Sequence, residues 1–368
     1  MILQPNYYDS FKCTADKCND NCCIGWEIDI DENTFNKYMN MDGNLGNRLK
    51  NDIITENGTH YFKLKENDRC PFLNNKNLCD IICELGENGL CQICNDHPRY
   101  INSYGNITER GLGLACEEAC RIILTQKEPA YLIDSESKIK YNPTIPEDSY
   151  LEYLYKIRNL IIDILQNKSY KITERIACVI EFCTYIQAEC NSEKSDNELL
   201  YSLNNITEYI GKLFKNIRND LPKNNKDKNN IIKNILIDYT ELEILDKNWK
   251  LLLNSTINSI ENCNDINLLN DCNSKFDDIY ENMLIYLTHR YFLESYYDNM
   301  IVEKALFMLS TYIVVKSISE YTSYDVIDII HSYSKEIEYS DMNIETLYGK
   351  YSLNSSYDKS NIYALLSD

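Results

Sequence analysis

The sequence predicts a mainly α-helical protein, in which a small irregular cysteine-rich metal-binding N-terminal part with short strands precedes an all-helical domain. Two observations support this fold class. Eleven of the sixteen cysteines and nine of the eleven glycines fall within residues 1–120, which is typical of a turn-rich segment without a large core. Later residues repeat apolar side chains at helical spacing. We therefore predict a cysteine-rich domain over 1–126, a linker over 127–147 and a helical domain over 148–368.

Short elements separated by turns are predicted through the cysteine-rich domain. Alternating apolar and polar residues predict a strand over 26–30, and Asp31 is suited to cap a helix over 31–53 that two glycines interrupt. A second strand is predicted over 60–65. The remaining patterns predict a turn and a short helix over 70–86, a loop over 94–100, where Pro98 breaks any helix, and a strand, a turn and a helix over 106–126.

Helical patterns dominate the rest of the chain. Pro129, Pro143 and Pro146 mark the linker, because proline interrupts regular structure. The clearest helix is predicted over 299–320, where the apolar residues form a broad face that must be buried. The predicted helices run over 148–166, 172–191, 196–218, 228–263, 276–297, 299–320 and 324–338.

Charge and the lack of targeting segments restrict the function classes. The chain has 57 acidic and 37 basic residues and a net charge of -20, which argues against binding to nucleic acid or to an anionic membrane. No signal peptide opens the sequence, and the apolar run 305–315 is too short to span a bilayer. We therefore expect a cytoplasmic protein, in which thiols stay reduced and act as metal ligands or as buried apolar groups.

Four cysteines fall within eleven residues near the start of the chain, in the segment CTADKCNDNCC (13–23). Thiolates bind soft metals, and folding can bring separated pairs together in one four-coordinate site. Adjacent Cys22 and Cys23 cannot easily serve one tetrahedral ion together, so we expect one of them to point elsewhere or to reach a second centre. The other cysteines of this part are Cys70, Cys79, Cys83, Cys91, Cys94, Cys116 and Cys120.

The cysteine spacing does not match two common metal motifs. A zinc ribbon needs two C-x2-C pairs, and only Cys91 and Cys94 have that spacing. Cys18 and Cys22 begin the C-x3-C-x2-C run of radical enzymes, but Cys23 follows at once. His97 is a candidate ligand or hydrogen-bond donor to one. Buried structural thiols are the alternative interpretation. We prefer it for Cys178, Cys183, Cys190, Cys263 and Cys272, which lack the spacing of paired ligands.

Several cysteine-containing stretches occur together in a familiar order. FKCTADKCNDNCCIGWEIDID, CPFL, LC, LGENGL, CNDHPRY and LGLACEEACR follow one another along the chain. This order resembles the flagellin lysine-N-methylases, which belong to a wider class of cysteine-rich zinc- or iron-chelating domains named for a CxxCxxCC pattern. The resemblance is specific over residues 1–125 and softer over 286–310.

The resemblance implies an enzyme that methylates lysine side chains of flagellin, with S-adenosylmethionine as methyl donor and a [4Fe-4S] cluster, zinc being the alternative metal. Departures from the family pattern are His97, which stands where tyrosine is usual, and Glu117, which stands where proline is usual. Cys83, Cys91 and Cys120 are additional cysteines. The metal ligands carried over by the resemblance are Cys13, Cys18, Cys22, Cys23, Cys70, Cys79, Cys94 and Cys116.

The expected chemistry is polar methyl transfer, because a deprotonated lysine amine is itself a nucleophile and needs no radical. The sequence contains no G-x-G-x-x-G after a strand, so a dinucleotide-type pocket for the donor is not expected. Residues 290–299 offer tyrosines and carboxylates for a lysine pocket, although such aromatic runs more often belong to the core. The alternative function is a non-enzymatic zinc- or iron-chelating protein with a helical interaction module.

Overall fold

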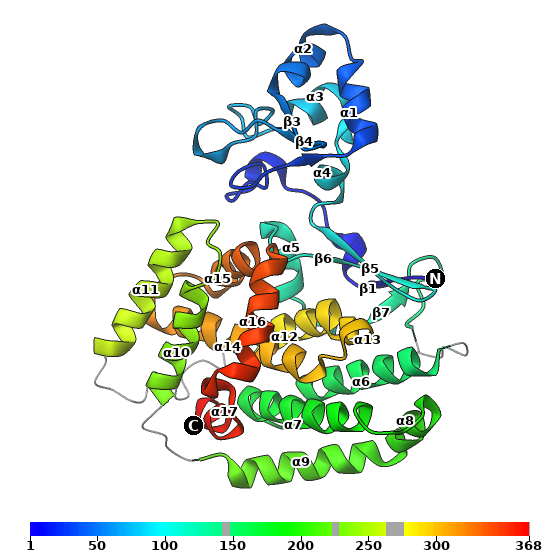
Figure 1. Ribbon diagram of the computed structural model, residues 1–368, viewed down its shortest axis with the longest axis vertical. Helices are drawn as coiled ribbons and strands as arrows, with labels where there is room; N and C mark the ends of the chain where they lie inside the picture. The colour runs from blue at the N-terminus through cyan, green and yellow to red at the C-terminus, as the bar shows by residue number, and fades with distance from the viewer. Residues whose placement is uncertain (142–147, 223–227, 263–275, 368) are drawn as a thin grey trace.

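The computed structural model describes residues 1–141, 148–222, 228–262 and 276–367. Figure 1 shows two lobes of unequal size. The small lobe is defined here as residues 23–96, and a connecting segment, residues 13–22, lies between it and the larger body. Helices make up most of the body, which confirms the predicted mainly α-helical fold class.

The small lobe combines short helices with a three-stranded sheet of order β2-β4-β3. Its elements are β2 (Asp29–Ile30), α1 (Glu32–Met39), α2 (Gly43–Asp52), β3 (Ile53–Glu56), β4 (Thr59–Phe62), α3 (Asp80–Leu85) and α4 (Gln92–Asp96). The predicted cap is confirmed, because the Asp31 carboxylate accepts a hydrogen bond from the backbone N–H of Thr34 at 3.0 Å. The helix expected over 31–53 is two helices, and β3 was not predicted.

A second sheet lies in the body and has the strand order β5-β6-β1-β7. Its strands are β1 (Ile2–Pro5), β5 (Arg99–Tyr104), β6 (Ile107–Leu112) and β7 (Leu132–Asp134), and α5 (Glu117–Leu124) follows β6. β1 runs parallel to β6 with Ile2 opposite Thr108, and antiparallel to β7 with Leu3 opposite Asp134. The small lobe is therefore an insertion between β1 and β5. Neither β1 nor β7 was predicted, and β5 begins within the loop expected over 94–100.

Helices form the remainder of the body. They are α6 (Ser149–Leu165), α7 (Ile172–Cys190), α8 (Asp196–Ser202), α9 (Ile206–Asp220), α10 (Lys228–Thr240), α11 (Lys247–Asn262), α12 (Asp277–Tyr291), α13 (Ser295–Asp298), α14 (Ile301–Tyr321), α15 (Val326–Tyr333), a π-helix (Ser334–Glu338), α16 (Asp341–Leu353) and α17 (Lys359–Leu366). The helix expected over 299–320 is confirmed as α14, which is buried on nearly all sides. The helix expected over 228–263 is divided into α10 and α11.

The buried apolar residues form two separate cores. The core of the small lobe is modest and includes Ile30, Leu49 and Phe72. The core of the body is far larger and joins residues of β1 and β6 to the helices, so that Leu3 and Leu154 belong to one cluster. The division into 1–126, 127–147 and 148–368 stays a prediction. The apolar core of the body contains residues of β1 and α5 together with residues of the later helices.

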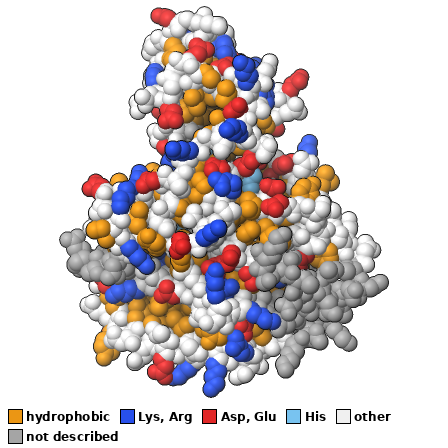
Figure 2. All heavy atoms as spheres, turned by 180° about the vertical axis from the view of Figure 1, so that it is seen from behind, with side chains coloured by type: hydrophobic (Ala, Val, Ile, Leu, Met, Phe, Trp, Pro, Cys, Tyr) orange, Lys and Arg blue, Asp and Glu red, His pale blue; other side chains and the backbone are white. Residues whose placement is uncertain are grey.

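The body surface is mixed in charge, as Figure 2 shows for one face, where basic side chains alternate with acidic ones. A phosphate-binding surface would need basic side chains gathered together. Among the described residues, no helix is both long enough and apolar enough to cross a membrane.

A buried ion pair fastens the sheet of the body to its helices. Arg158 of α6 is 0% exposed, and its guanidinium donates to both oxygens of Glu109 on β6, each at 2.7 Å. The hydroxyl of Tyr155 donates to the same carboxylate at 2.7 Å. A charge buried this deeply is tolerated only while its partner is present.

We predict that Arg158→Met lowers the free energy of unfolding by about 3–5 kcal/mol, because it leaves the Glu109 carboxylate buried and unpaired. The double variant Glu109→Leu with Arg158→Met should recover most of this loss. Chemical denaturation followed by circular dichroism measures both. Lys212→Met, which breaks the exposed pair with Glu208, is the matched control and should change stability by less than about 1 kcal/mol. Equal losses in the single and double variants would contradict the prediction.

Candidate functional site at the junction of the two lobes

The cysteines expected to bind metal fall into two neighbouring sets. The first, here named the junction thiols, comprises Cys13, Cys18, Cys22 and Cys116. Burial raises the pKa of Cys116 to about 11, and the nearby charges of Cys22 and Cys13 add to this rise. Burial likewise raises the pKa of Cys18 to about 12, with further contributions from Glu117, Cys116 and Cys22. Cys13 and Cys22 are exposed, so this set is open to solvent.

The second set lies inside the small lobe and is named here the lobe thiols. It comprises Cys23, Cys70, Cys79, Cys91 and Cys94, all of which pack into or against the small core. The pKa of Cys23 is raised by a hydrogen bond with Cys22, by burial, and by the charges of Cys22, Cys70 and Cys79. The pKa of Cys94 is raised by a hydrogen bond with Cys91, by burial, and by the charges of Cys91, Cys23 and Cys70. The thiols of Cys91 and Cys94 share a hydrogen bond, and all five cysteines pack into or against the same small core.

Backbone N–H groups are directed at several of these sulfurs. Backbone N–H groups of Phe72 and Leu73 lower the pKa of Cys70, those of Ile81 and Ile82 lower the pKa of Cys79, and those of Glu118 and Ala119 lower the pKa of Cys116, but burial outweighs them and each pKa is raised. In each case the donors lie two and three residues after the cysteine. Such hydrogen bonds stabilise a thiolate, which is the form that binds metal. The type of ligand atom present, a cysteine sulfur near backbone N–H groups, therefore fits a thiolate-bound metal centre.

The sulfurs of these cysteines do not form a coordination sphere for a metal ion. Within the described ranges, no group of three histidine, cysteine, aspartate or glutamate side chains is arranged to hold one metal ion. Cys22 and Cys23 share a hydrogen bond, as do Cys91 and Cys94. Protonated thiols paired in this way must lose protons and turn inward when a metal binds.

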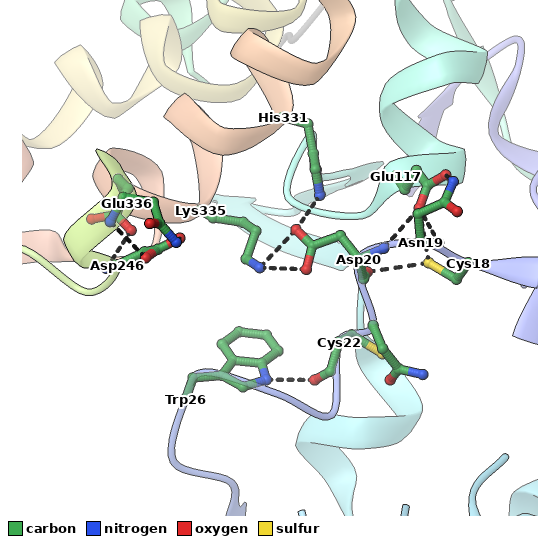
Figure 3. Close-up of polar contacts among 12 residues, drawn as sticks. Cys18, Asn19, Asp20, Cys22, Trp26, Glu117, Asp246, His331, Lys335 and Glu336 are labelled. Carbon is green, nitrogen blue, oxygen red and sulfur yellow. Dashed lines mark hydrogen bonds and ion pairs between the residues drawn. The ribbon is translucent and has the colours of Figure 1, made fainter. Parts of the chain in front are cut away.

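The connecting segment is held to the body by two carboxylates (Figure 3). Asp20 accepts from Lys335 at 2.8 Å and from Nε2 of His331 at 2.9 Å. Nδ1 of His331 donates to the carbonyl of Leu114 at 2.9 Å. Both ring nitrogens of His331 therefore lie within hydrogen-bond distance of an oxygen atom. Burial alone would raise the pKa of Asp20, but these hydrogen bonds and charges outweigh it and lower the pKa to about 2.

Glu117 at the start of α5 makes the second attachment. Its carboxylate accepts from the backbone N–H groups of Asn19 and Asp20 at 2.7 and 3.0 Å, and from the Cys18 thiol at 3.3 Å. Burial would raise the pKa of Glu117, but these hydrogen bonds lower it. The departure from the family pattern at Glu117 therefore has a structural role here, because proline could make none of these bonds.

The π-helix Ser334–Glu338 supplies the body side of the junction. Lys335 points to Asp20, whereas Glu336 points the other way and accepts from the backbone N–H groups of Leu245 and Asp246 (Figure 3). Glu338 is 4% exposed and accepts from the hydroxyls of Tyr286 and Tyr291, each at 2.8 Å. π-turns are frequent at functional sites. The π-helix thus directs its three charged side chains toward three different parts of the fold.

Three aromatic rings line the junction beside Cys22. The ring of Trp26 makes edge contacts with His97 at 5.2 Å and with Tyr339 at 5.0 Å. The indole N–H of Trp26 donates to the carbonyl of Cys22 at 2.5 Å. Charges of Cys116 and Cys22 contribute to the raised pKa of Tyr339, after burial and Glu338. The rings therefore border the junction thiols.

Two polar atoms near these rings have no hydrogen-bond partner among the described residues: Nε2 of His97 and Oε1 of Glu338. Gly113 is closely packed in this region. A Cβ atom added at Gly113 would lie 3.2 Å from the guanidinium of Arg290 and 3.3 Å from the carbonyl oxygen of Pro98. Burial lowers the pKa of His97 to about 4, so its ring is neutral at physiological pH. Two buried polar atoms without partners are suited to a ligand's donor groups.

Of the residues proposed for a lysine pocket, Tyr296 and Tyr297 pack edge to face at 5.0 Å, and Glu294 and Asp298 both pair with Lys304. Tyr291 is buried against Glu338, whereas Tyr296 bonds Asp148, and Tyr297 is 67% exposed. The structure instead brings Lys335, Glu338 and Tyr339 to the junction. Sequence reasoning missed these residues, because the pattern over 324–338 predicted only an amphipathic helix.

Burial explains three of the remaining cysteines, and Cys190 is half-buried. Cys120, Cys178 and Cys183 are each 0% exposed in the core of the body, which agrees with structural thiols. Cys83 is exposed on α3. Cys263 and Cys272 lie outside the described residues.

Comparison with known proteins identifies the family. Residues 158–365, more than half of the chain, match the model of the FliB lysine N-methylase C-terminal domain. The chain belongs to the FliB lysine N-methylase family. Because this match covers the helices of the body and the cysteine stretches lie before it, two different parts of the chain support the same family.

Individual FliB-related proteins agree with this assignment. The chain is 30% identical over 142 residues to the flagellar biosynthetic protein FliU of Salmonella muenchen, which covers 37% of this chain and 84% of that protein. It is 26% identical over 196 residues to the lysine-N-methylase of Salmonella typhimurium, which covers 50% of this chain and 47% of that protein. The match thus spans about half the length of the lysine N-methylase. No solved structure matches the chain.

We predict that Asp20→Asn loosens the connecting segment of this FliB-family protein, because an amide cannot hold both cations. Hydrogen exchange of residues 13–22 should accelerate by about tenfold, the effect of one charged hydrogen bond. The depressed pKa gives the sign of the pH effect: the contribution is complete above about pH 4 and is lost as the pH falls towards about 2. Asp16→Asn, at an exposed position of the same segment, should leave exchange unchanged. Unaltered exchange in Asp20→Asn would contradict the prediction.

Proposed function

We propose that this protein methylates the ε-amino groups of lysine side chains in flagellin, in the cytoplasm, with S-adenosylmethionine as donor and a cysteine-bound [4Fe-4S] cluster. The observation that carries the proposal is the match of residues 158–365 to the lysine N-methylase domain. The name of the FliU relative supports a flagellar substrate. The cysteine ligands are drawn from Cys13, Cys18, Cys22, Cys23, Cys70, Cys79, Cys94 and Cys116.

The junction thiols are the better place for a cluster that meets a substrate. They are the more exposed of the two sets, and Trp26, His97 and Tyr339 border them. A cluster held by three of these thiols would supply an iron to anchor polar groups of the donor. Lys335 and His331, held by Asp20, set positive charge beside these thiols, which offsets part of the charge of ionised sulfurs.

Methyl transfer needs a neutral amine aligned with the sulfonium methyl group. The amine lone pair forms the new N–C bond while the C–S bond breaks, and the product ammonium then loses one proton. Both the donor sulfonium and a lysine ammonium are cations, which aromatic faces attract. Trp26 is half-buried beside Cys22, so its ring is accessible to such a cation. His97 and Glu338 offer acceptor atoms for the N–H groups of the substrate amine.

We predict that Trp26→Leu weakens binding of the donor or of a lysine peptide by about 3- to 30-fold, the range expected for loss of one cation–π contact. Trp26→Phe should retain most of the affinity, because a ring remains. Isothermal titration of cluster-replete protein measures both variants. Equal affinities in the wild type and Trp26→Leu would remove Trp26 from the site.

The decisive experiment uses the complete chain purified without oxygen. Cluster-replete protein is incubated with flagellin and S-adenosylmethionine, and flagellin peptides are then analysed by mass spectrometry. We expect methyl groups on lysine together with S-adenosylhomocysteine, and no 5′-deoxyadenosine. Formation of 5′-deoxyadenosine during turnover would replace polar transfer with a radical mechanism.

Failure to bind the donor and to methylate flagellin would favour the second candidate function, a chelating protein with a helical interaction module. The number and density of thiols in the first 120 residues favour that alternative. The large helical body counts against it, because a chelating domain alone does not need so many further residues.

A further inference from the structure

The sheet of the body has an open edge at β5. This strand is the outermost one in the order β5-β6-β1-β7, and its six residues make it longer than the opposite edge strand β7, which has three. β7 is also paired further, since Ile133 forms a bridge with Lys140. An outermost strand carries backbone N–H and C=O groups that its own sheet does not satisfy. Such an edge can pair with another extended chain.

The hydrogen bonds between β5 and β6 fix which residues face this edge. The two strands are antiparallel, and the ladder continues just beyond them, where the backbone N–H of Gly113 donates to the carbonyl of Pro98 at 2.7 Å. Alternate residues of an antiparallel strand bond the same neighbour. Since Pro98 faces β6, Tyr100 and Asn102 face it as well. The odd-numbered residues of β5 therefore turn their backbone groups to the open edge.

The contacts of these odd-numbered residues agree with this geometry. Arg99, Ile101 and Ser103 are all exposed, and Ile101, at the centre of the strand, is 63% exposed. The carbonyl of Ser103 accepts from the hydroxyl of Tyr297 at 2.7 Å, so it points away from β6. Among the described residues, no other hydrogen bond reaches the outward backbone groups of β5. The outward N–H and C=O of Ile101 are therefore available to a partner.

This edge begins at the junction of the two lobes. Arg99 follows His97 by two residues, and the ring of His97 contacts Trp26 at 5.2 Å. A strand rises about 3.3 Å per residue, so Ile101 lies at most about 13 Å along the chain from His97. A peptide paired with β5 would therefore reach the junction about four residues from its position opposite Ile101. A lysine at that point of the peptide would lie beside Trp26.

The surroundings of the edge favour a basic segment. Tyr297 belongs to α13, so its hydrogen bond holds this helix beside β5. Glu294 and Asp298 flank it in sequence, and both pair with Lys304. The side chain of Lys304 is 1% exposed, whereas those of Glu294 and Asp298 are 40% and 34% exposed. One buried cation thus leaves net negative charge at the surface next to the edge, and a lysine-bearing segment complements that charge.

We propose that the open edge of β5 binds an extended segment of the protein substrate by backbone pairing and directs the adjacent lysine toward the junction. Backbone pairing supplies affinity, while the exposed side chains of β5 contact alternate side chains of the bound segment. The role of this segment as substrate rests on the proposed function. The pairing itself rests on the geometry of the sheet.

The first test measures hydrogen exchange of individual amides in the complete chain, with and without a saturating lysine-containing flagellin peptide. The amides of Ile101 and Ser103 should exchange at least about threefold more slowly with peptide, because each gains a hydrogen bond. Those of Tyr100 and Asn102 should not change, since they already bond β6. No slowing at Ile101 and Ser103, or equal slowing of all four amides, would overturn the proposal.

The second test changes the centre of the edge. Ile101→Pro removes an outward N–H and leaves the bonds to β6 in place, as an edge strand allows. It should raise the KM for flagellin by about three- to tenfold, the effect of one lost hydrogen bond, and leave kcat nearly unchanged. The matched control Ile101→Thr keeps both the N–H and a β-branched side chain, so its KM should change by less than about twofold. An unchanged KM in a folded Ile101→Pro would overturn the proposal.

A third test keeps the chain unmodified and decides the question if Ile101→Pro does not fold. Flagellin peptides that carry one backbone N-methyl group, moved along the peptide, are titrated against the protein. Only alternate amides of a paired strand face β5, so the affinity should fall at every second position. A uniform effect, or a dimer of the chain that Ile101→Pro abolishes, would overturn the proposal. Because titration needs no turnover, peptide pairing without methylation would contradict only the proposed function.

Discussion

The arrangement of the junction depends on the hydrogen bonds that the Asp20 carboxylate accepts from Lys335 and His331. Asp20 lies between Cys18 and Cys22, so its position sets where the first cysteines of the chain lie relative to the body. Both cations come from the end of α15 and the π-helix, more than 300 residues away in sequence. A short irregular segment has little packing of its own, and charged hydrogen bonds therefore define its place.

The two thiol sets lie in different environments. The junction thiols are partly exposed and lie beside three aromatic rings. The lobe thiols pack into or against the small core. Access of solvent and of a ligand therefore differs between the two sets.

Several features followed from local sequence because local physics decides them. Asp31 caps its helix through its own neighbours, and the apolar pattern of 299–320 requires a buried helix. The strand β1 was missed, because four residues carry too little pattern and their pairing with β6 joins residues about a hundred positions apart. The break between α10 and α11 was also missed. Glu336, from the distant π-helix, accepts the N–H groups of Leu245 and Asp246 at that break.

By itself, the sequence determined the mainly helical fold class, the family resemblance and the dense group of thiols near the start. Cysteine identity predicts metal chemistry for such a group, because thiolates are soft ligands wherever they lie. Only the tertiary structure decided which of the distant cysteines pack into the small core, and that the thiols of Cys22 and Cys23 share a hydrogen bond. It also decided that Lys335, Glu338 and Tyr339 border the site. Such groupings depend on how distant segments pack, and a spacing along one chain carries no record of distances across the fold.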